Sequence, residues 1–218
     1  MAFKRYRLER YSDDEMRKRI DAFHEKMDGR RTIRHFSTDP VPIDVVRKCI
    51  EVAGTAPSGA HKQPWTFCLV TDLDIRRKIR EAAEHEESLN YGGRMSEQWI
   101  EDLKPFGTDH IKPFIEEAPA LIVVFKHKYG KSEDGRTSNY YVNESVGIAV
   151  GMLLTALHEV GLTALTHTPS PMNFLSEILE RPENERAYLN IPVGFPVDGC
   201  EVPDISRKKL EAILAEYP

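Results

Sequence analysis

The stretch from Tyr141 to Val160 constrains the fold of this 218-residue chain more than any other segment. Its apolar residues fall on nearly all sides of a helical projection, so we expect a central buried helix. The run from Ala120 to Phe125 is short, continuous and apolar, which is typical of a strand buried on both faces. A buried helix beside a buried strand predicts a layered fold, either α+β or α/β.

Composition narrows the class of protein. The chain is long enough for one sizeable domain, and its hydrophobic share of 40% beside 30% charged residues favours a packed core. A net charge of -5 argues against a dedicated nucleic-acid binder. The three cysteines are widely separated and form no CxxC pair, so we expect neither a disulfide framework nor a metal site. Free thiols, the lack of a signal-peptide core and the lack of a membrane-length apolar run predict a soluble cytoplasmic protein.

Spacing and capping signals predict the other elements. Ser12 and Glu15 form a capping box before a helix that ends at Gly29, and a second helix runs from Pro42 to about Gly54. We expect a polar loop over 126–139 and a weakly helical end that packs on another surface, such as a second subunit. The remaining predictions are strands over 65–71, 162–168 and 188–193, one long helix over 74–103 and a short helix over 173–180.

Three arginines form the densest cationic cluster. Arg30, Arg31 and Arg34 lie within five positions, with Thr32 between them. Guanidinium groups match phosphate oxygens bidentately, so the cluster suits a phosphate ester. A solvated helix end is the simpler alternative, and composition alone favours it. The absence of a P-loop or GxGxxG motif disfavours nucleotides that are held in those ways.

Two short segments are further candidates. The loop Ala56–His61 could present backbone N–H groups to a ligand, although a plain connection is the simpler interpretation. Thr166, His167 and Thr168 end a predicted strand, where hydroxyls often just satisfy backbone groups. A lone histidine is more often structural, so His167 receives no catalytic role.

Glu87 and Tyr91 stand four residues apart and share a helix face. Together with Lys112 they could clasp an amino-acid zwitterion, with Glu87 on the ammonium and the other two on the carboxylate. Unrelated solvated charges on an acidic helix are the alternative, which these residues alone would favour.

The signals occur together in an order that resembles the nitroreductase superfamily and, within it, the iodotyrosine deiodinases. The motifs are RRTIRHF, GTAPSGAHKQPW, EESLNY, THTP and VPDISRK, and the similarity runs from about Gly29 to Leu210. The resemblance implies an FMN-dependent enzyme that removes halide from iodo-, bromo- and chlorotyrosine by one-electron steps. It implies an α+β fold, a three-layer α/β/α sandwich with a central buried helix, in a domain-swapped homodimer. The membrane anchor of the animal members has no counterpart in this sequence, and His167 replaces a hydroxyl residue expected in them.

The same resemblance divides the single domain, residues 1–218, into functional parts. We expect an N-terminal helical arm over 1–28, a substrate lid over 85–112 and a dimer-wrapping extension over 198–218. The lid is expected to bind the amino-acid part of the halotyrosine through Glu87, Tyr91 and Lys112. The backbone N–H of Ala60 is expected to meet the substrate phenolate. The expected FMN contacts are Arg30, Arg31, Thr32, Arg34, Arg207, Thr166, His167 and Thr168, with Pro57, Ser58 and Gly59 donated across the dimer interface. Thr168 is the expected catalytic hydroxyl, near flavin N5.

Two other functions stay open on the sequence. A general nitroreductase or enone reductase would use the same FMN site with NAD(P)H as the reductant. A non-catalytic protein would use the arginine cluster to hold a flavin, a phosphate or an acidic partner.

Overall fold

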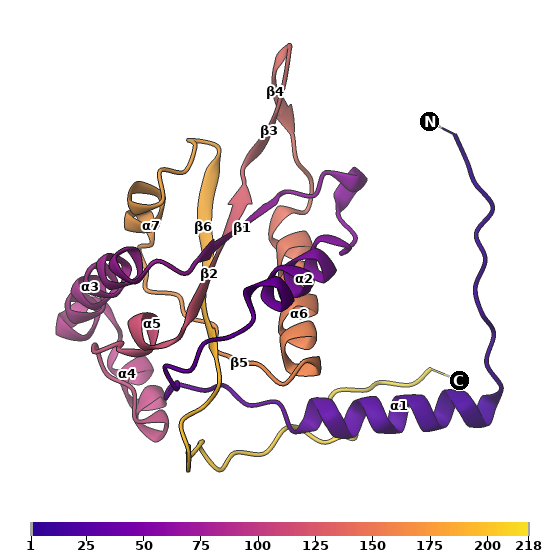
Figure 1. Ribbon diagram of the computed structural model, residues 1–218, viewed down its shortest axis with the longest axis horizontal. Helices are drawn as coiled ribbons and strands as arrows, with labels where there is room; N and C mark the ends of the chain where they lie inside the picture. The colour runs from indigo at the N-terminus through magenta and orange to yellow at the C-terminus, as the bar shows by residue number, and fades with distance from the viewer. Residues whose placement is uncertain (1, 218) are drawn as a thin grey trace.

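A four-stranded antiparallel sheet of strand order β1-β2-β6-β5 forms the middle of the molecule (Figure 1). The computed structural model describes residues 2–217, so residues 1 and 218 of the expected arm and extension lie outside the described part. The strands are β1 (Trp65–Val70), β2 (Ala120–His127), β6 (Glu185–Gly194) and β5 (Thr163–Ala164). The strands expected near 65–71, 120–125 and 188–193 are confirmed. The one expected over 162–168 is reduced to β5 and an isolated bridge between His167 and Asn190.

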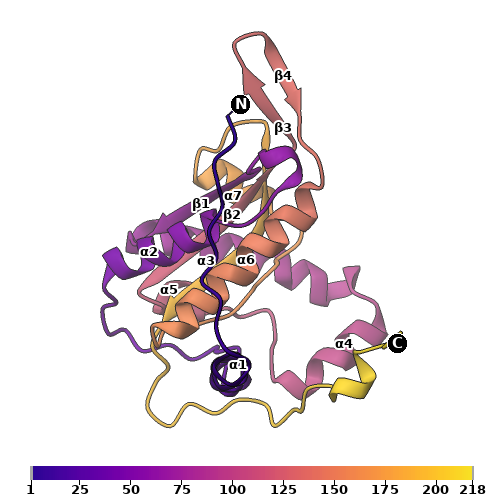
Figure 2. The ribbon, with the colours of Figure 1, turned by 90° about the vertical axis from the view of Figure 1, so that its right-hand side faces the viewer.

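Helices cover both faces of the sheet, which confirms the three layers (Figures 1 and 2). One face carries α2 (Ile43–Gly54) and α6 (Val142–Glu159); the other carries α3 (Leu73–Leu89), α5 (Phe114–Glu117) and α7 (Asn173–Ile178). Side chains of a strand alternate between its faces. Ile122 and Val124 therefore pack with the first group of helices, and Leu121, Val123 and Phe125 with the second. This alternation accounts for the uninterrupted apolar sequence of β2.

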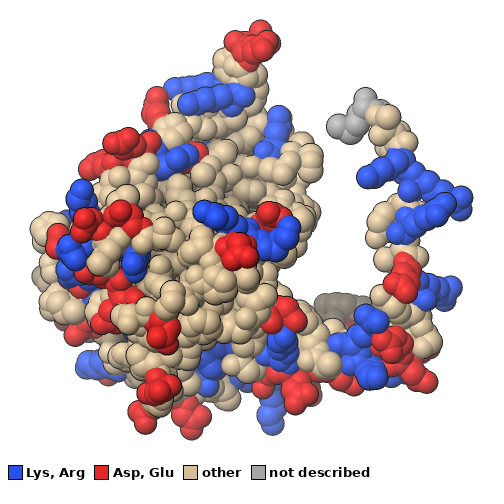
Figure 3. All heavy atoms as spheres, in the orientation of Figure 1, with Lys and Arg blue, Asp and Glu red and all other residues tan. Residues whose placement is uncertain are grey.

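The first helix, α1 (Asp13–Asp28), begins at the expected cap, where the backbone N–H of Glu15 donates to Ser12 Oγ over 3.3 Å. It buries no residue and extends away from the sheet, with Met16 and Ile20 exposed along its apolar stripe (Figure 1). The extended arm before it is rich in Lys and Arg (Figure 3). The C-terminal segment is extended apart from one 3-10 turn, Leu210–Ala212, so the expected weak helix is mostly absent.

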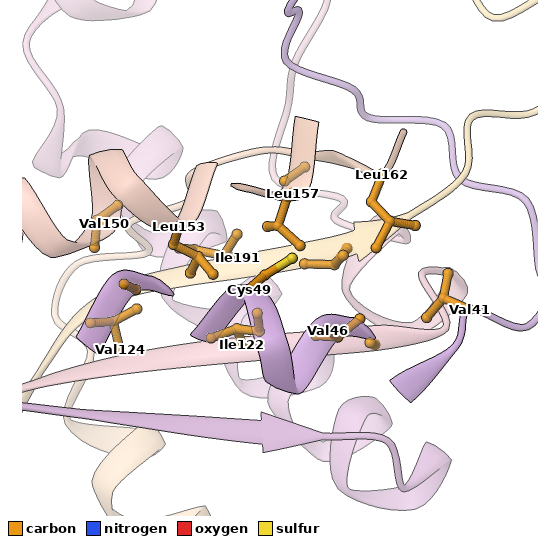
Figure 4. Close-up of a cluster of buried hydrophobic side chains, with 14 of the residues drawn as sticks. Val41, Val46, Cys49, Ile122, Val124, Val150, Leu153, Leu157, Leu162 and Ile191 are labelled. Atoms are coloured by element: carbon orange, nitrogen blue, oxygen red, sulfur yellow. The ribbon is translucent and has the colours of Figure 1, made fainter. Parts of the chain in front are cut away.

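The helix α6 is buried on one face only. Val146, Leu153 and Leu157 pack against the sheet and α2, in the cluster that Figure 4 shows around Cys49. On its other face Ile148 is 47% exposed. That face and α2 line an apolar groove of about 1000 Å³, to which Phe23 of α1 contributes. Within a single chain, the expectation of a wholly buried helix is therefore only half right.

Two segments differ from expectation. The long helix predicted over 74–103 is interrupted after α3 by the π-helical turn Asn90–Arg94, in which Gly93 has φ of 140°, and resumes as α4 (Glu97–Leu103). The predicted polar loop over 126–139 contains instead a hairpin of β3 (Tyr129–Ser132) and β4 (Gly135–Ser138), whose two-residue turn Glu133–Asp134 is followed by Gly135 at a positive φ of 116°. Short 3-10 turns occur at Gly59–His61 and Lys104–Phe106. No helix in the described range 2–217 has the length and apolar character needed to cross a membrane.

Candidate functional site

The arginine cluster lies beside the edge of the sheet, where the chain leaves α1. Thr32 forms a parallel bridge with Ala164, and Ile33 is buried beneath it. Because side chains alternate along an extended segment, burial of Ile33 turns Thr32 and Arg34 outward. There they line a pocket of about 190 Å³, whose other lining residues are Arg30, Arg31, Phe106, Pro203, Ile205, Ser206 and Arg207.

The C-terminal extension closes one side of this arginine pocket. Arg207 donates to the backbone and side-chain oxygens of Asp28 over 2.8 Å and to the Arg30 carbonyl over 2.6 Å. Arg31 donates in turn to the carbonyl of Pro203. Arg207 was expected among the FMN contacts, and the structure brings it to the other arginines despite a separation of more than 170 positions.

Arg207 is paired with Asp28, whereas Arg30, Arg31 and Arg34 form no ion pair among the described residues. Burial lowers the pKa of Arg30, and repulsion from Arg207 and Arg31 lowers it further. A bound anion stabilises arginine charges that repel one another, and a guanidinium group can bind two phosphate oxygens at once. The pocket therefore fits a phosphate monoester.

A second pocket, of about 230 Å³, adjoins the first because Arg34 lines both. We call it the lid pocket. It contains the three residues expected to clasp a zwitterion and the expected strand end. Its lining residues are Arg34, Glu87, Asn90, Tyr91, Met95, Trp99, Leu103, Thr108, Lys112, Phe114, Leu165, Thr166, His167, Thr168 and Ser170.

Glu87 and Lys112 form a buried charge pair in the lid pocket. Their side chains are 8% and 5% exposed, and Glu87 Oε2 lies 3.9 Å from Lys112 Nζ. Burial lowers the pKa of Lys112, which the charge of Glu87 partly opposes. Lys112 Nζ also donates to Thr108 Oγ1 over 3.0 Å and to the carbonyl of Asp109. The ammonium is thereby fixed by three oxygen groups at one wall of the pocket.

Tyr91 completes the trio. Its ring lies 5.7 Å from Lys112 Nζ, and its hydroxyl donates to the carbonyl of Thr108 over 3.2 Å. Burial raises the pKa of Tyr91, and the charge of Glu87 adds to this. The phenol therefore stays protonated and can serve as a hydrogen-bond donor.

The π-helical turn Asn90–Arg94 is tied to the segment that follows Thr168. Asn90, in the π-helical turn, donates through Nδ2 to the carbonyl of Ser170 over 2.8 Å. Ser96 then caps α4 by accepting the N–H of Trp99 over 3.2 Å. These contacts fix both sides of the turn that carries Tyr91.

The segment Thr166–Thr168 alternates between the pocket and the interior. His167 donates its N–H to the carbonyl of Asn190 over 2.8 Å, and Asn190 returns a bond of 2.9 Å. Thr166 and Thr168 are exposed beside the pocket, whereas His167 is buried. Thr168 therefore lines the lid pocket, and its place near flavin N5 stays a prediction. The imidazole of His167 instead packs edge-on against Phe114, with ring centroids 5.4 Å apart, behind the open face.

The loop with Pro57, Ser58, Gly59 and Ala60 lines neither pocket. The N–H of Gly59 donates to Ser145 Oγ over 3.3 Å, which places the loop at the N-terminal end of α6. The arginines approach the opposite end, where Arg30 and His158 line a common cavity. Since α6 has 18 residues, its ends are about 27 Å apart. A single chain therefore does not bring this loop to the arginines.

Sequence reasoning gave no role to several residues that line the pockets. Phe106 lines the arginine pocket with its ring below Arg34, whose guanidinium lies 6.0 Å from the ring centroid. Asn90 belongs to the EESLNY motif that carried the resemblance and Trp99 follows it, but nothing in their spacing predicted a contact. Thr108 holds both Lys112 and Tyr91, and its position in a loop gave no signal.

Comparisons with known proteins identify the family of this chain. The nitroreductase family model matches residues 27–195. An iodotyrosine deiodinase from Haliscomenobacter hydrossis is 54% identical over 99% of this chain and 98% of its own length. Rat iodotyrosine deiodinase 1 is 45% identical over 94% of this chain and 73% of its own.

Solved structures give the same result. The crystal structure of an oxidized iodotyrosine deiodinase bound to FMN and 3-iodo-L-tyrosine matches with a TM-score of 0.76 and 30% identity, over 90% of this chain and 98% of that one. A nitroreductase from Bacteroides fragilis with bound FMN, 16% identical with a TM-score of 0.66, shares the fold. The chain therefore belongs to the nitroreductase family and, within it, to the iodotyrosine deiodinases.

Proposed function

We propose that this protein is an FMN-dependent reductive dehalogenase that converts free iodo-, bromo- and chlorotyrosine to tyrosine and halide. The observation that carries the proposal is the trio of buried Glu87 and Lys112 with half-buried Tyr91, in a pocket that shares Arg34 with the arginine pocket. The three free cysteines fit a reducing cytoplasm as the compartment.

The residues present fit FMN. Arg30, Arg31 and Arg207 would hold its phosphate, because their mutual repulsion is relieved by an anion. Arg34 lies where the two pockets meet, with Phe106 beneath it in the arginine pocket, and Thr168 is exposed at the lid pocket. Bound there, FMN would supply the electrons for reduction of the carbon–halogen bond.

The trio matches the charges of a free amino acid. Glu87 would accept from the substrate ammonium and Lys112 would donate to its carboxylate, as would Tyr91 once its hydroxyl turns from the Thr108 carbonyl. In the pair at 3.9 Å each partner offsets the buried charge of the other, and a zwitterion between them would offset both. A halophenol that lacks the amino-acid part has neither charge to offer. The walls around the trio keep water from these contacts, which strengthens them.

Thr168 is suited to hold a proton at the cofactor. Its hydroxyl is exposed in the lid pocket on a segment that backbone bonds to Asn190 hold in place. A hydroxyl is both donor and acceptor, so Thr168 would donate to flavin N5 or accept from it as the protonation of that atom changes.

A homodimer would complete the site. A twofold axis perpendicular to α6 near its middle would place the loop Pro57–Ala60 of one chain near the arginines of the other, because the two lie at opposite ends of α6. The apolar groove along α6 and the exposed stripe of α1 are surfaces that such a partner would cover. The backbone N–H of Ala60 would then meet the substrate phenolate.

Halide release tests this function directly. The purified protein, loaded with FMN and reduced under anaerobic conditions, is mixed with 3-iodo-, 3-bromo- or 3-chlorotyrosine, and free halide and tyrosine are quantified. Equimolar halide and tyrosine are expected. Rapid NAD(P)H-driven reduction of nitroarenes without halide release would instead assign the protein to the general nitroreductases.

A further inference from the structure

His167 lies in the inner wall of the lid pocket, and its ring forms no hydrogen bond with any residue that the structure describes. It is 9% exposed, and among the described residues neither ring nitrogen has a hydrogen-bond partner. The nearest acidic atom is Glu87 Oε1, which lies 3.5 Å from His167 Nε2, just beyond an ordinary hydrogen bond. A buried polar ring without partners is costly, and native proteins keep few of them.

Glu87 is held from two sides. One carboxylate oxygen, Oε2, faces Lys112 at 3.9 Å, and the other, Oε1, faces His167 at 3.5 Å. Lys112 alone would draw the carboxylate to its own side of the pocket. The imidazole supplies a second attachment on the opposite oxygen. Phe114, edge-on to the ring at 5.4 Å, and the backbone bonds to Asn190 restrict its movement.

We propose that His167 is a positioning residue for halotyrosine recognition, whose Nε2–H holds the Glu87 carboxylate in the orientation that receives the substrate ammonium. This inference rests on the proposed function, because it assigns Glu87 to the ammonium. A small closure of the lid shortens the 3.5 Å contact to a hydrogen bond, as apo sites commonly do when they are filled.

The role requires a neutral imidazole. Burial lowers the pKa of His167 below its ordinary value of 6.5; Glu87 opposes this, while the charges of Lys112 and Arg34 add to it. A neutral ring donates to Glu87 without bringing a positive charge into the pocket. An imidazolium would give Glu87 a second cation and would compete with the substrate ammonium. Affinity for the amino-acid part therefore falls once the pH drops well below 6.5.

Substitution of His167 distinguishes a role in substrate recognition from a role in the stability of the fold. The probes are 3-iodotyrosine and 2-iodophenol, and their dissociation constants are measured by calorimetry with the FMN-loaded protein. His167→Phe is expected to raise the constant for iodotyrosine about tenfold, the usual effect of losing a hydrogen bond to a charged group, and to leave that for iodophenol unchanged. His167→Gln, which keeps an N–H donor at a similar reach, is expected to retain most of the affinity.

The chain offers a matched control. His127 Nε2 lies 3.4 Å from Glu185 Oε1, which makes a second histidine–glutamate pair, but the His127 side chain is 24% exposed, its Nε2 also bonds Thr66 Oγ1 over 2.8 Å, and it lines neither pocket. His127→Phe is expected to leave both dissociation constants unchanged. An equal rise for iodotyrosine in His127→Phe and His167→Phe would overturn the proposal, because it would show a general effect on folding.

Two readouts do not depend on the folding of a His167 variant. In the wild type, the ratio of iodotyrosine to iodophenol affinity is expected to fall several-fold between pH 7 and pH 5. NMR titration of labelled histidine is expected to show that Glu87→Gln lowers the pKa of His167, because Glu87 raises it. A flat ratio, or a His167 pKa indifferent to Glu87→Gln, would overturn the proposal.

These outcomes also separate the inference from the proposed function. Halide release together with unchanged iodotyrosine binding in His167→Phe would reject the positioning role and leave the deiodinase function intact. Absence of both iodotyrosine binding and halide release in the wild type would reject the deiodinase function, while the NMR titration would still test the contact between His167 and Glu87.

Discussion

Lys112 shows at the scale of one residue how recognition and stability share the same side chain. The ammonium is almost fully buried, and the carboxylate of Glu87 beside it is buried as well. Such a pair adds little to stability as a whole, but removal of one partner leaves an uncompensated charge. The site thus keeps its two charges inside the protein only because they lie together.

We therefore predict that Lys112→Met lowers the free energy of unfolding by about 3 kcal/mol, measured by urea denaturation at pH 7. Lys104→Met is the control, since Lys104 forms an exposed pair with Glu101. It is expected to change the free energy by less than about 0.5 kcal/mol. Equal midpoints for the two variants would contradict the view that Glu87 depends on Lys112.

Most of the site residues that could be predicted from the sequence were predicted from their residue types and motifs. The Arg30–Arg34 cluster, the trio of Glu87, Tyr91 and Lys112, and Thr168 acquired roles by resemblance, and the structure brings them into two adjoining pockets. Taken singly, each had a simpler interpretation, because spacing does not reveal contacts between distant segments. The turn of His167 toward Glu87 depends on its bridge to Asn190, which no local pattern encodes.

At the scale of elements, the lid region shows where periodicity misled. Charges at helical spacing suggested one helix over 74–103, but Gly92 and Gly93 interrupt it, and α3 passes into a π-helical turn. The hairpin of β3 and β4 was missed for a similar reason, because polar composition outweighed the Asp–Gly pair at its turn. Strands buried on both faces were predictable, since a short continuous apolar run is typical of a strand with helices on either side.

The break in the lid yields a prediction. Gly93 adopts φ of 140°, a conformation that a residue with Cβ reaches at a cost of roughly 1–3 kcal/mol. Gly93→Ala is expected to loosen the turn that carries Tyr91, to weaken iodotyrosine binding several-fold and to speed trypsin cleavage after Arg94. Gly92→Ala is the control, because a Cβ there meets no atom within 4 Å and φ is not positive. Similar binding in the two variants would show that the backbone of the turn is not strained by the substitution.

At the scale of the whole molecule, the described chain leaves two apolar surfaces without cover. The groove beside α6 has a volume of about 1000 Å³, and α1 buries none of its residues. The sequence predicted a buried helix from its composition, and the structure shows that one chain buries only the sheet-facing half. The apolar composition of a helix reflects its burial in the final assembly, including burial between subunits. The apolar residues on the exposed face of α6 therefore support an interface with a second copy of the chain.

Disruption of this surface provides the decisive test of the homodimer. Ile148 is 47% exposed in the middle of α6 and lines the groove, so Ile148→Asp would place a charge in the proposed interface. The wild type is expected to sediment at about twice the chain mass of 24.9 kDa, and the variant at the chain mass itself. FMN affinity is expected to fall at least tenfold in the variant, because the loop Pro57–Ala60 reaches the arginines only from a partner. Leu73→Asp, at a site 47% exposed at the start of α3, is the control and should keep both mass and FMN. A monomeric wild type that holds FMN tightly would show that one chain completes the site alone.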